Sequence, residues 1–189
     1  MKNVFILAGI WIFLLLLPYP VSAATAPPEV GGVLPEIILA TPANPEHLKY
    51  LGLKAAENFT IPQIKAQVVI VEIFSMYCPH CQREAPTVNT LFNKIINDIK
   101  FKDKLKLIGI GVGNSEFEVD VFRKNYKIAF PLFADADFKI HKMIGEVRTP
   151  YFIAVKINPD GTHRVIYSKL GGIKDVAKFL DLILGLSEK

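Results

Sequence analysis

Runs of apolar residues along the chain predict the strands of a β-sheet. The first core run, Val68-Val69-Ile70-Val71-Glu72-Ile73-Phe74, is β-branched and apolar at almost every position, which is typical of a buried parallel strand. Two further runs, 105–112 and 151–157, predict a second and a third strand. The turn sequence Asn158-Pro159-Asp160-Gly161 then predicts a hairpin, whose returning antiparallel strand covers 164–167. Shorter extended pieces are expected at 36–40 and 131–133.

Apolar positions at helical spacing predict helices between these strands. Pro79 suits the first turn of a helix, and Val88, Leu91 and Ile95 repeat at helical spacing until Asp98. The other expected helices cover 45–56, 135–144, 174–184 and a segment capped by Asn114 or Ser115 that ends at Tyr126. The order of strands and helices predicts an α/β fold: a central mixed sheet, mainly parallel with an antiparallel edge, flanked by helices.

The first residues of the chain have the composition of an export signal. Lys2 precedes an apolar run, Val4–Leu17, that is shorter than the roughly 20 residues a membrane-spanning helix needs. Small residues follow, and they suit cleavage by signal peptidase after Ala23 or Ala26. We expect an exported, periplasmic protein; the alternative is an uncleaved anchor that holds the protein on the periplasmic side of a membrane. The expected divisions are a signal peptide at 1–23 (or to 26), an extended lead-in at 24–60 and a folded domain at 61–187.

Composition argues against several classes of protein. Lys and Arg are interspersed with Asp and Glu at a formal net charge of +4, without the basic patch of a nucleic-acid-binding protein. A zinc site would need two ligands beyond the two cysteines, and His47, His141 and His163 lie in separate segments without ligand spacing. We therefore expect no metal, no cofactor, no nucleic-acid partner and a monomer.

The two cysteines, Cys78 and Cys81, form a CxxC motif between the first core strand and the following helix. Such a pair cannot join distant segments, which favours a redox-active disulfide over a structural disulfide or half of a metal site. The helix N-terminus favours a thiolate at Cys78, the expected nucleophile, and Cys81 can resolve the mixed disulfide one turn further in. Between them, Pro79 opens the helix, and the His80 imidazole is expected to stabilise the Cys78 thiolate and make the disulfide more oxidising.

Glu72 places a carboxyl group in the middle of the first apolar strand, six residues before Cys78. Burial of a carboxylate is costly, so its pKa should be raised. Such an acid beneath the cysteine pair is a candidate to accept and return the proton of Cys81 during exchange. The alternative is that Glu72 reaches solvent or pairs with a lysine.

Thr149-Pro150 precedes the third strand. Proline is nearly the only residue that permits a cis peptide bond, and a cis bond here would turn the Thr149 backbone toward Cys78. A substrate segment could then pair with that backbone as an added strand. From spacing alone, a proline that merely starts a strand is the alternative.

These motifs resemble the thioredoxin superfamily. The segment Val71–Cys81, which contains Cys78-Pro79-His80-Cys81, resembles the active site of DsbA-type oxidases, including a buried acid at the position of Glu72. The layout over residues 60–185 instead resembles the TlpA/ResA branch of thiol–disulfide oxidoreductases, with its peroxiredoxin-type strand–helix insertion. That layout rests on Phe130-Pro131, Asp135, Thr149-Pro150 and Asp160-Gly161, and it implies a cis peptide bond at Pro150.

The resemblance implies a thioredoxin-like fold and an enzyme that exchanges disulfides with exported proteins or apocytochromes, together with a membrane or periplasmic electron partner. Tyr77, which stands where the branch often carries Trp, is expected to contact substrate with Thr149 and Pro150. The TlpA-like body favours a reductase in cytochrome c maturation, whereas the CPHC sequence favours a disulfide-donating oxidase. Peroxiredoxins and Sco-like copper-delivery proteins have related bodies. The PxxxTxxC pattern of a peroxidase is missing before Cys78, and copper delivery would need His141 as a distant ligand.

Overall fold

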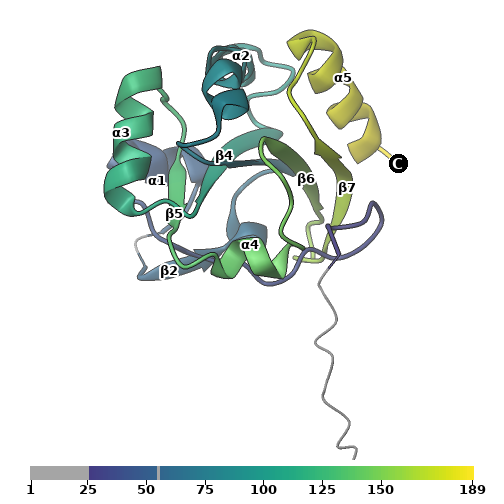
Figure 1. Ribbon diagram of the computed structural model, residues 1–189. Coiled ribbons are helices and arrows are strands. Elements are labelled where there is room, and N and C mark those ends of the chain that lie inside the picture. Colours follow the sequence, from purple (N-terminus) through teal and green to yellow (C-terminus); the bar gives the residue numbers. More distant parts are fainter. Residues whose placement is uncertain (1–25, 55) are drawn as a thin grey trace, which may run out of the picture.

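The computed structural model describes residues 26–54 and 56–189, which fold around a five-stranded sheet (Figure 1). The strands follow the order β5 (Leu132–Asp135), β4 (Leu105–Val112), β3 (Val68–Phe74), β6 (Tyr151–Ile157) and β7 (His163–Leu170). β3, β4 and β5 are parallel, and β6 and β7 are each antiparallel to the preceding strand in this order. The mixed sheet with an antiparallel edge, and the bounds of β3, β4 and β6, are as the apolar runs predict.

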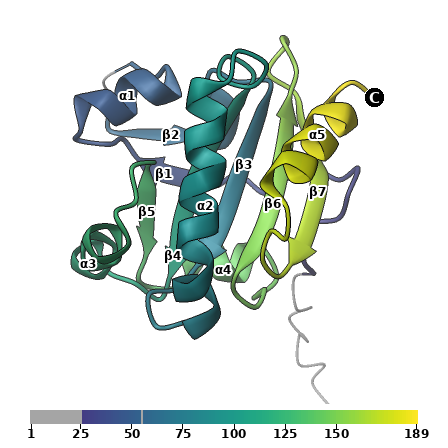
Figure 2. The ribbon, with the colours of Figure 1, turned by 90° about the horizontal axis from the view of Figure 1, so that it is seen from above.

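Two helices cover one face of this sheet, as the view from above shows (Figure 2). They are α2 (Pro79–Asn97) and α5 (Val176–Ser187), and α3 (Glu116–Tyr126) lies at the side near β5. Val68, Ile70 and Phe74 of β3 contribute to the core on this face, because alternate residues of a strand point the same way. Glu72 belongs to the same alternating set, so its carboxyl group points toward the helical layer.

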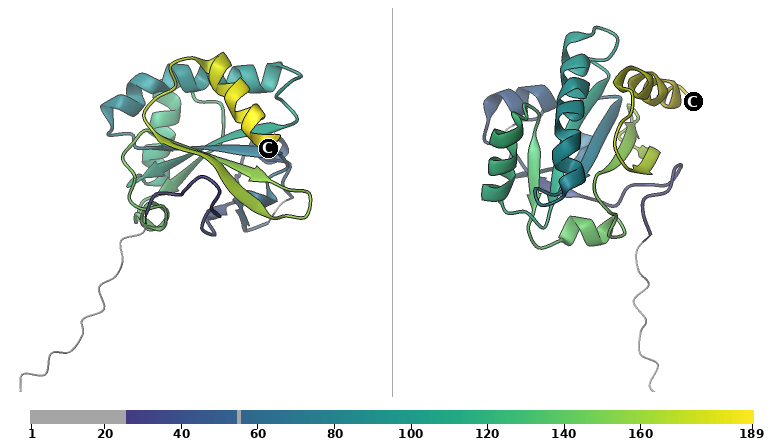
Figure 3. Two further views of the ribbon diagram at one scale, coloured as in Figure 1. Left: turned by 90° about the vertical axis from the view of Figure 1, so that its right-hand side faces the viewer. Right: turned by 45° about the horizontal axis from the view of Figure 1, so that its top comes forward.

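The segment before β3 covers the opposite face of the sheet. It contains β1 (Ile38–Ala40), α1 (Pro45–Leu51), β2 (Asn58–Thr60) and a 3₁₀ turn (Ile61–Gln63), with β1 and β2 antiparallel. Leu34, Ile37 and Phe59 are buried there against the second set of β3 side chains, and α4 (Lys139–Met143) completes the layer. Figure 3 shows the sheet between the two layers. The lead-in therefore contributes to the hydrophobic core.

Two helices are shorter than expected, and each has a local cause. The helix predicted at 45–56 ends at Leu51, because Gly52 adopts a left-handed conformation with φ 65° and its N–H donates to the last carbonyls of the helix. The helix predicted at 135–144 covers only Lys139–Met143. Asp135 instead ends β5, and its carboxylate accepts hydrogen bonds from the backbone N–H groups of Ile140 and His141.

Several boundaries differ from the expected ones by a few residues. The sequence does not predict β2; β1 and β5 begin later than expected, β7 extends to Leu170, and α5 begins at Val176 after an Asp175 cap. The expected signal peptide, 1–23, lies outside the described residues. In the part of the chain that the structure describes, none of the helices has the length and apolar character needed to cross a membrane.

Candidate active site

Cys78 lies where the central strand β3 gives way to helix α2. It is the N-cap residue of α2, and its Sγ accepts a hydrogen bond from the backbone N–H of Cys81 at 3.4 Å. Pro79 occupies the first turn, where its missing N–H costs nothing. Both cysteines are free thiols; Cys78 is partly exposed, whereas Cys81 is fully buried. Cys78 is thus the sulfur that a partner can reach. Cys81 can react only with a mixed disulfide that has formed at Cys78.

The surroundings shift the two thiol pKa values in opposite directions. Partial burial alone would raise the pKa of Cys78, but hydrogen bonds from the Thr149 side chain and from the backbone N–H groups of Cys81 and His80 outweigh it, and the pKa lies below its ordinary value of 9.0. Burial raises the pKa of Cys81 to about 12. Since the thiolate is the attacking species, Cys78 is the sulfur suited to attack and Cys81 the one held in reserve.

The loop that ends at Pro150 faces Cys78 from the other side. The Thr149–Pro150 peptide bond is cis, which confirms the expectation from the family resemblance. The Cys78 thiol donates to the backbone carbonyl of Thr149, with 3.4 Å between Sγ and oxygen. Main-chain groups of this loop are therefore within reach of any chain that is bonded to Cys78.

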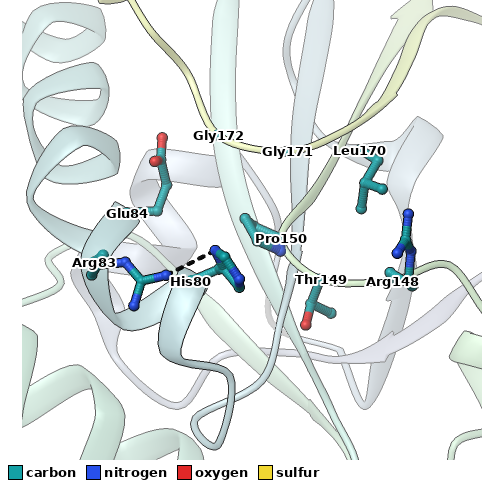
Figure 4. A pocket seen from close by; sticks show the side chains of 9 residues that line it. All are labelled: His80, Arg83, Glu84, Arg148, Thr149, Pro150, Leu170, Gly171 and Gly172. Atoms are coloured by element: carbon teal, nitrogen blue, oxygen red, sulfur yellow. Dashed lines mark hydrogen bonds between the residues drawn. The ribbon is translucent and has the colours of Figure 1, made fainter.

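The His80 side chain does not take the position that the sequence suggested. Its Nδ1 lies 2.9 Å from a guanidinium nitrogen of Arg83, one helical turn further along (Figure 4). A guanidinium can only donate, so Nδ1 must accept, and the ring proton is then on Nε2. The contribution of His80 to the lowered Cys78 pKa comes from its backbone N–H. The expectation that the imidazole stabilises the Cys78 thiolate is therefore not supported by this arrangement.

Two carboxyl groups, that of Glu72 on β3 and that of Glu84 on α2, lie close enough to interact. Glu72 is buried at 3% exposure, and burial, with a smaller effect from the nearby Glu84, raises its pKa from 4.5 to about 8. Burial also raises the pKa of Glu84, whose carboxylate accepts a hydrogen bond of 2.6 Å from the backbone N–H of Ile173. Glu72 therefore has the raised pKa that its sequence position predicts. The charge that acts on it is that of Glu84 rather than that of Cys81.

Side chains from α2, from α3 and from the loop after β4 hold Met76 and Tyr77, the two residues before Cys78. Asn114 is fully buried and accepts from the Met76 backbone N–H at 2.8 Å, while the Gln82 side chain donates to the Met76 carbonyl at 2.7 Å. The Tyr77 hydroxyl donates to Glu118 at the start of α3, so this side chain is tied to a neighbouring helix while remaining exposed.

Sequence reasoning missed four residues of this site. They are Arg83, Glu84, Asn114 and Arg148. Glu84 follows Cys81 by three residues and so shares its face of the helix, a signal that was available. Asn114 and Arg148 come close only through the order of the strands.

The remaining histidines do not converge on the cysteines. His47, His141 and His163 lie within hydrogen-bonding distance of the backbone carbonyls of Ala129, Val147 and Leu34 respectively. Among residues 26–54 and 56–189, no cluster of three or more His, Cys, Asp or Glu side chains suits a metal ion.

The fold and the reactive dithiol define an oxidoreductase of the thioredoxin-like class, and comparisons with known proteins agree. Residues 44–166 match the AhpC/TSA family, and the chain belongs to that family. It is 24% identical to thiol-disulfide oxidoreductase ResA of Halalkalibacterium halodurans over 130 residues, which are 67% of this chain and 68% of ResA. It is 29% identical to sporulation thiol-disulfide oxidoreductase A of Bacillus subtilis over 89 residues, 46% of this chain and half of that relative.

A solved structure shows the same fold. The chain superposes on the crystal structure of StoA from Bacillus subtilis with a TM-score of 0.55 and 21% identity, covering 80% of this chain and 98% of StoA. The superposition shows a shared fold, and the two named relatives support a thiol–disulfide oxidoreductase.

Proposed function

We propose that this chain is an exported enzyme that reduces disulfide bonds of exported proteins or apocytochromes and is re-reduced by a thiol–disulfide partner at the membrane or in the periplasm. One observation carries the exchange chemistry, whichever way the electrons flow: Cys78, with a lowered pKa, faces the Thr149 carbonyl, while Cys81 is buried with a raised pKa. The reductive direction draws support from the TlpA/ResA-like layout of the chain and from its similarity to ResA.

The reaction needs only the two thiols and a substrate disulfide. The Cys78 thiolate attacks one sulfur of the substrate, the substrate disulfide breaks, and its second sulfur leaves as a thiolate that takes up a proton. Cys81 then loses its proton and attacks Cys78, so that the second substrate thiol leaves and the Cys78–Cys81 disulfide forms. Two electrons pass to the substrate. The partner returns them by the same exchange in reverse.

Glu72 is our candidate for the group that takes the Cys81 proton. A thiol with a pKa of about 12 needs a base as it attacks, and a carboxyl group with a pKa of about 8 is ionised in part of the molecules near neutral pH. Glu84, the electrostatic neighbour of Glu72, lies closer to the surface and offers a route by which that proton reaches solvent.

A disulfide-donating oxidase is the second candidate, and one observation favours it. A lowered pKa at Cys78 stabilises the reduced form of the pair, which makes its disulfide a stronger oxidant. The oxidase would run the same two exchange steps in the opposite direction. The two candidates therefore differ in reduction potential and partner, and they share their catalytic residues.

Export is proposed from the sequence of the first 26 residues. Expression in a bacterial host followed by mass spectrometry of the periplasmic protein tests it: cleavage gives an N-terminus at Ala24 or Pro27. An intact N-terminus in the membrane fraction would support the anchored alternative, and retention in the cytoplasm would contradict both.

A trapping experiment tests the activity. In Cys81→Ser the second step is blocked, so mixing the reduced protein with a disulfide-bonded peptide should give a stable mixed disulfide at Cys78. Cys78→Ser should give none. The absence of adduct in Cys81→Ser, or equal adduct in both variants, would refute the proposed function.

A further inference from the structure

A cavity of about 410 Å³ opens beside the cysteine pair, between α2, the Thr149–Pro150 loop and the end of β7 (Figure 4). Thr149, whose carbonyl accepts from the Cys78 thiol, lines it, so this cavity is within reach of a segment bonded to Cys78. Arg83 lines it from α2 and Arg148 from the residue before Thr149. Figure 4 shows Pro150 and Thr149 between these two arginines.

The charge left uncompensated in this cavity is positive. Neither arginine forms an ion pair with a carboxylate of the described residues, and the hydrogen bond of Arg83 goes to the acceptor nitrogen of His80. The one carboxylate in the lining, Glu84, is half-buried and hydrogen-bonded to the backbone N–H of Ile173. Arg83 and Arg148 are both exposed, so their guanidinium groups can contact a bound chain.

An apolar side chain also lines the cavity. Leu170, 40% exposed at the end of β7, lines the cavity. The neighbouring Gly171 N–H donates a hydrogen bond to the Pro150 carbonyl. The groove therefore offers one apolar contact and two guanidinium groups, and each guanidinium can hold a carboxylate through two parallel hydrogen bonds.

We propose that Arg83 and Arg148 select substrate segments in which the reacting cysteine is flanked by Asp or Glu. This inference rests on the proposed function and adds the chemical class of its substrate. An acidic neighbour on one side of the substrate cysteine would meet the guanidinium on α2, and one on the other side would meet the guanidinium before Thr149. A lysine at either place would be repelled, so the two arginines both favour one class of partner and disfavour another.

Peptide disulfides of defined charge test this. The probes are symmetrical disulfides of the blocked peptides Ala-X-Cys-X-Ala, with X as Glu, Gln or Lys, reduced by the dithiol protein in single turnover. Each rate is divided by that of the same disulfide with 2-mercaptoethanol, which removes the effect of X on intrinsic reactivity. We expect the corrected rates to favour Glu over Lys by about 3- to 10-fold at low salt and to converge as salt screens the charges.

Substitution locates the effect. Arg148→Gln and Arg83→Gln should each lower the Glu-to-Lys ratio by about threefold. Arg164→Gln is the matched control, because Arg164 pairs with Lys156 at the far end of the β6–β7 hairpin, and it should leave the ratio unchanged. A ratio near one, or one that Arg148→Gln and Arg83→Gln do not change, would overturn this inference alone. If the protein reduced none of the three peptides, the proposed function itself would be overturned.

Discussion

The Sγ atom of Cys78 lies 3.4 Å from the carbonyl oxygen of Thr149, although 71 positions of sequence separate the two residues. Cys78 follows the central strand β3, and Thr149 immediately precedes the cis bond before β6. β3 and β6 are neighbouring antiparallel strands, so the end of one meets the beginning of the other at the same edge of the sheet. The sheet thus places the reacting sulfur against the backbone that a substrate must approach.

Selective alkylation tests the assignment of nucleophile and resolving thiol. With iodoacetamide at pH 7, Cys78 should react at least about a hundredfold faster than Cys81, because thiolate fraction governs the rate. The pH midpoint for Cys78 should lie below 9.0. Peptide mapping by mass spectrometry identifies the modified sulfur. Equal labelling of both cysteines in the folded protein would contradict the assignment, and denatured protein supplies the reference for two accessible thiols.

Three substitutions separate the groups that lower the Cys78 pKa. Thr149→Ala removes a side-chain hydrogen bond and should raise the alkylation midpoint, while Thr149→Ser should restore it. His80→Ala keeps the backbone N–H and removes a ring that is turned to Arg83, so its midpoint should stay close to that of the wild type. A larger rise in His80→Ala than in Thr149→Ala would show that the imidazole acts on the thiolate after all.

Glu72 should make the folded protein less stable as the pH rises. Its pKa is raised from 4.5 to about 8, so between these values the folded state keeps a proton that the unfolded state releases, and the free energy of unfolding falls with increasing pH. At pH 7 Glu72 lowers the free energy of unfolding by an amount on the order of 3 kcal/mol. Glu72→Gln should remove it. Urea unfolding of both proteins from pH 4 to pH 8 measures the difference.

The exposed Glu57 provides a matched control, because Glu57→Gln should leave the pH dependence of stability as it is in the wild type. The same Glu72→Gln protein tests the proton transfer: the rate at which Cys81 releases a substrate bonded to Cys78 should fall and lose its dependence on pH near 8. Parallel stability curves for Glu72→Gln and the wild type would contradict the burial of the carboxyl group, and unchanged exchange rates at every pH would end the proposed transfer.

Asn114 should be needed to hold the loop before Cys78. Asn114→Ala leaves the Met76 N–H without its acceptor in a partly buried place, which should cost about 1–3 kcal/mol of stability and slow disulfide exchange. Asn114→Asp keeps an acceptor oxygen and should recover part of both. The exposed Asn125 supplies a control in Asn125→Ala. Full activity and stability in Asn114→Ala would show that the loop holds its position without this contact.

The sequence predicts β3, β4 and β6 with their observed bounds, because runs such as Val68–Phe74 are buried on both faces and, Glu72 apart, apolar throughout. The lead-in is different. Phe59 and Ile37 are buried by a sheet face formed much later in the chain, so no local pattern marks β2. Helix ends depended on single capping groups, such as the Gly52 conformation and the Asp135 carboxylate.

The site was predicted to a similar extent. Sequence positions alone predict three features of the site: a CxxC between strand and helix, a proline before β6 and a carboxyl group within β3. The orientation of the His80 ring depends on a side-chain contact that spacing does not determine. In the structure the ring accepts a hydrogen bond from Arg83. That Arg83 and Arg148 line the same cavity requires the strand order, because β6 returns beside β3 only after two intervening strands.

The reduction potential of the Cys78–Cys81 pair tests the central claim most directly. The mature protein is equilibrated with glutathione buffers, and the oxidised fraction is read by thiol labelling. If the enzyme removes disulfides, the potential should lie near that of thioredoxin, about −270 mV. A value near that of DsbA, about −120 mV, would contradict a reductase and establish a disulfide donor instead.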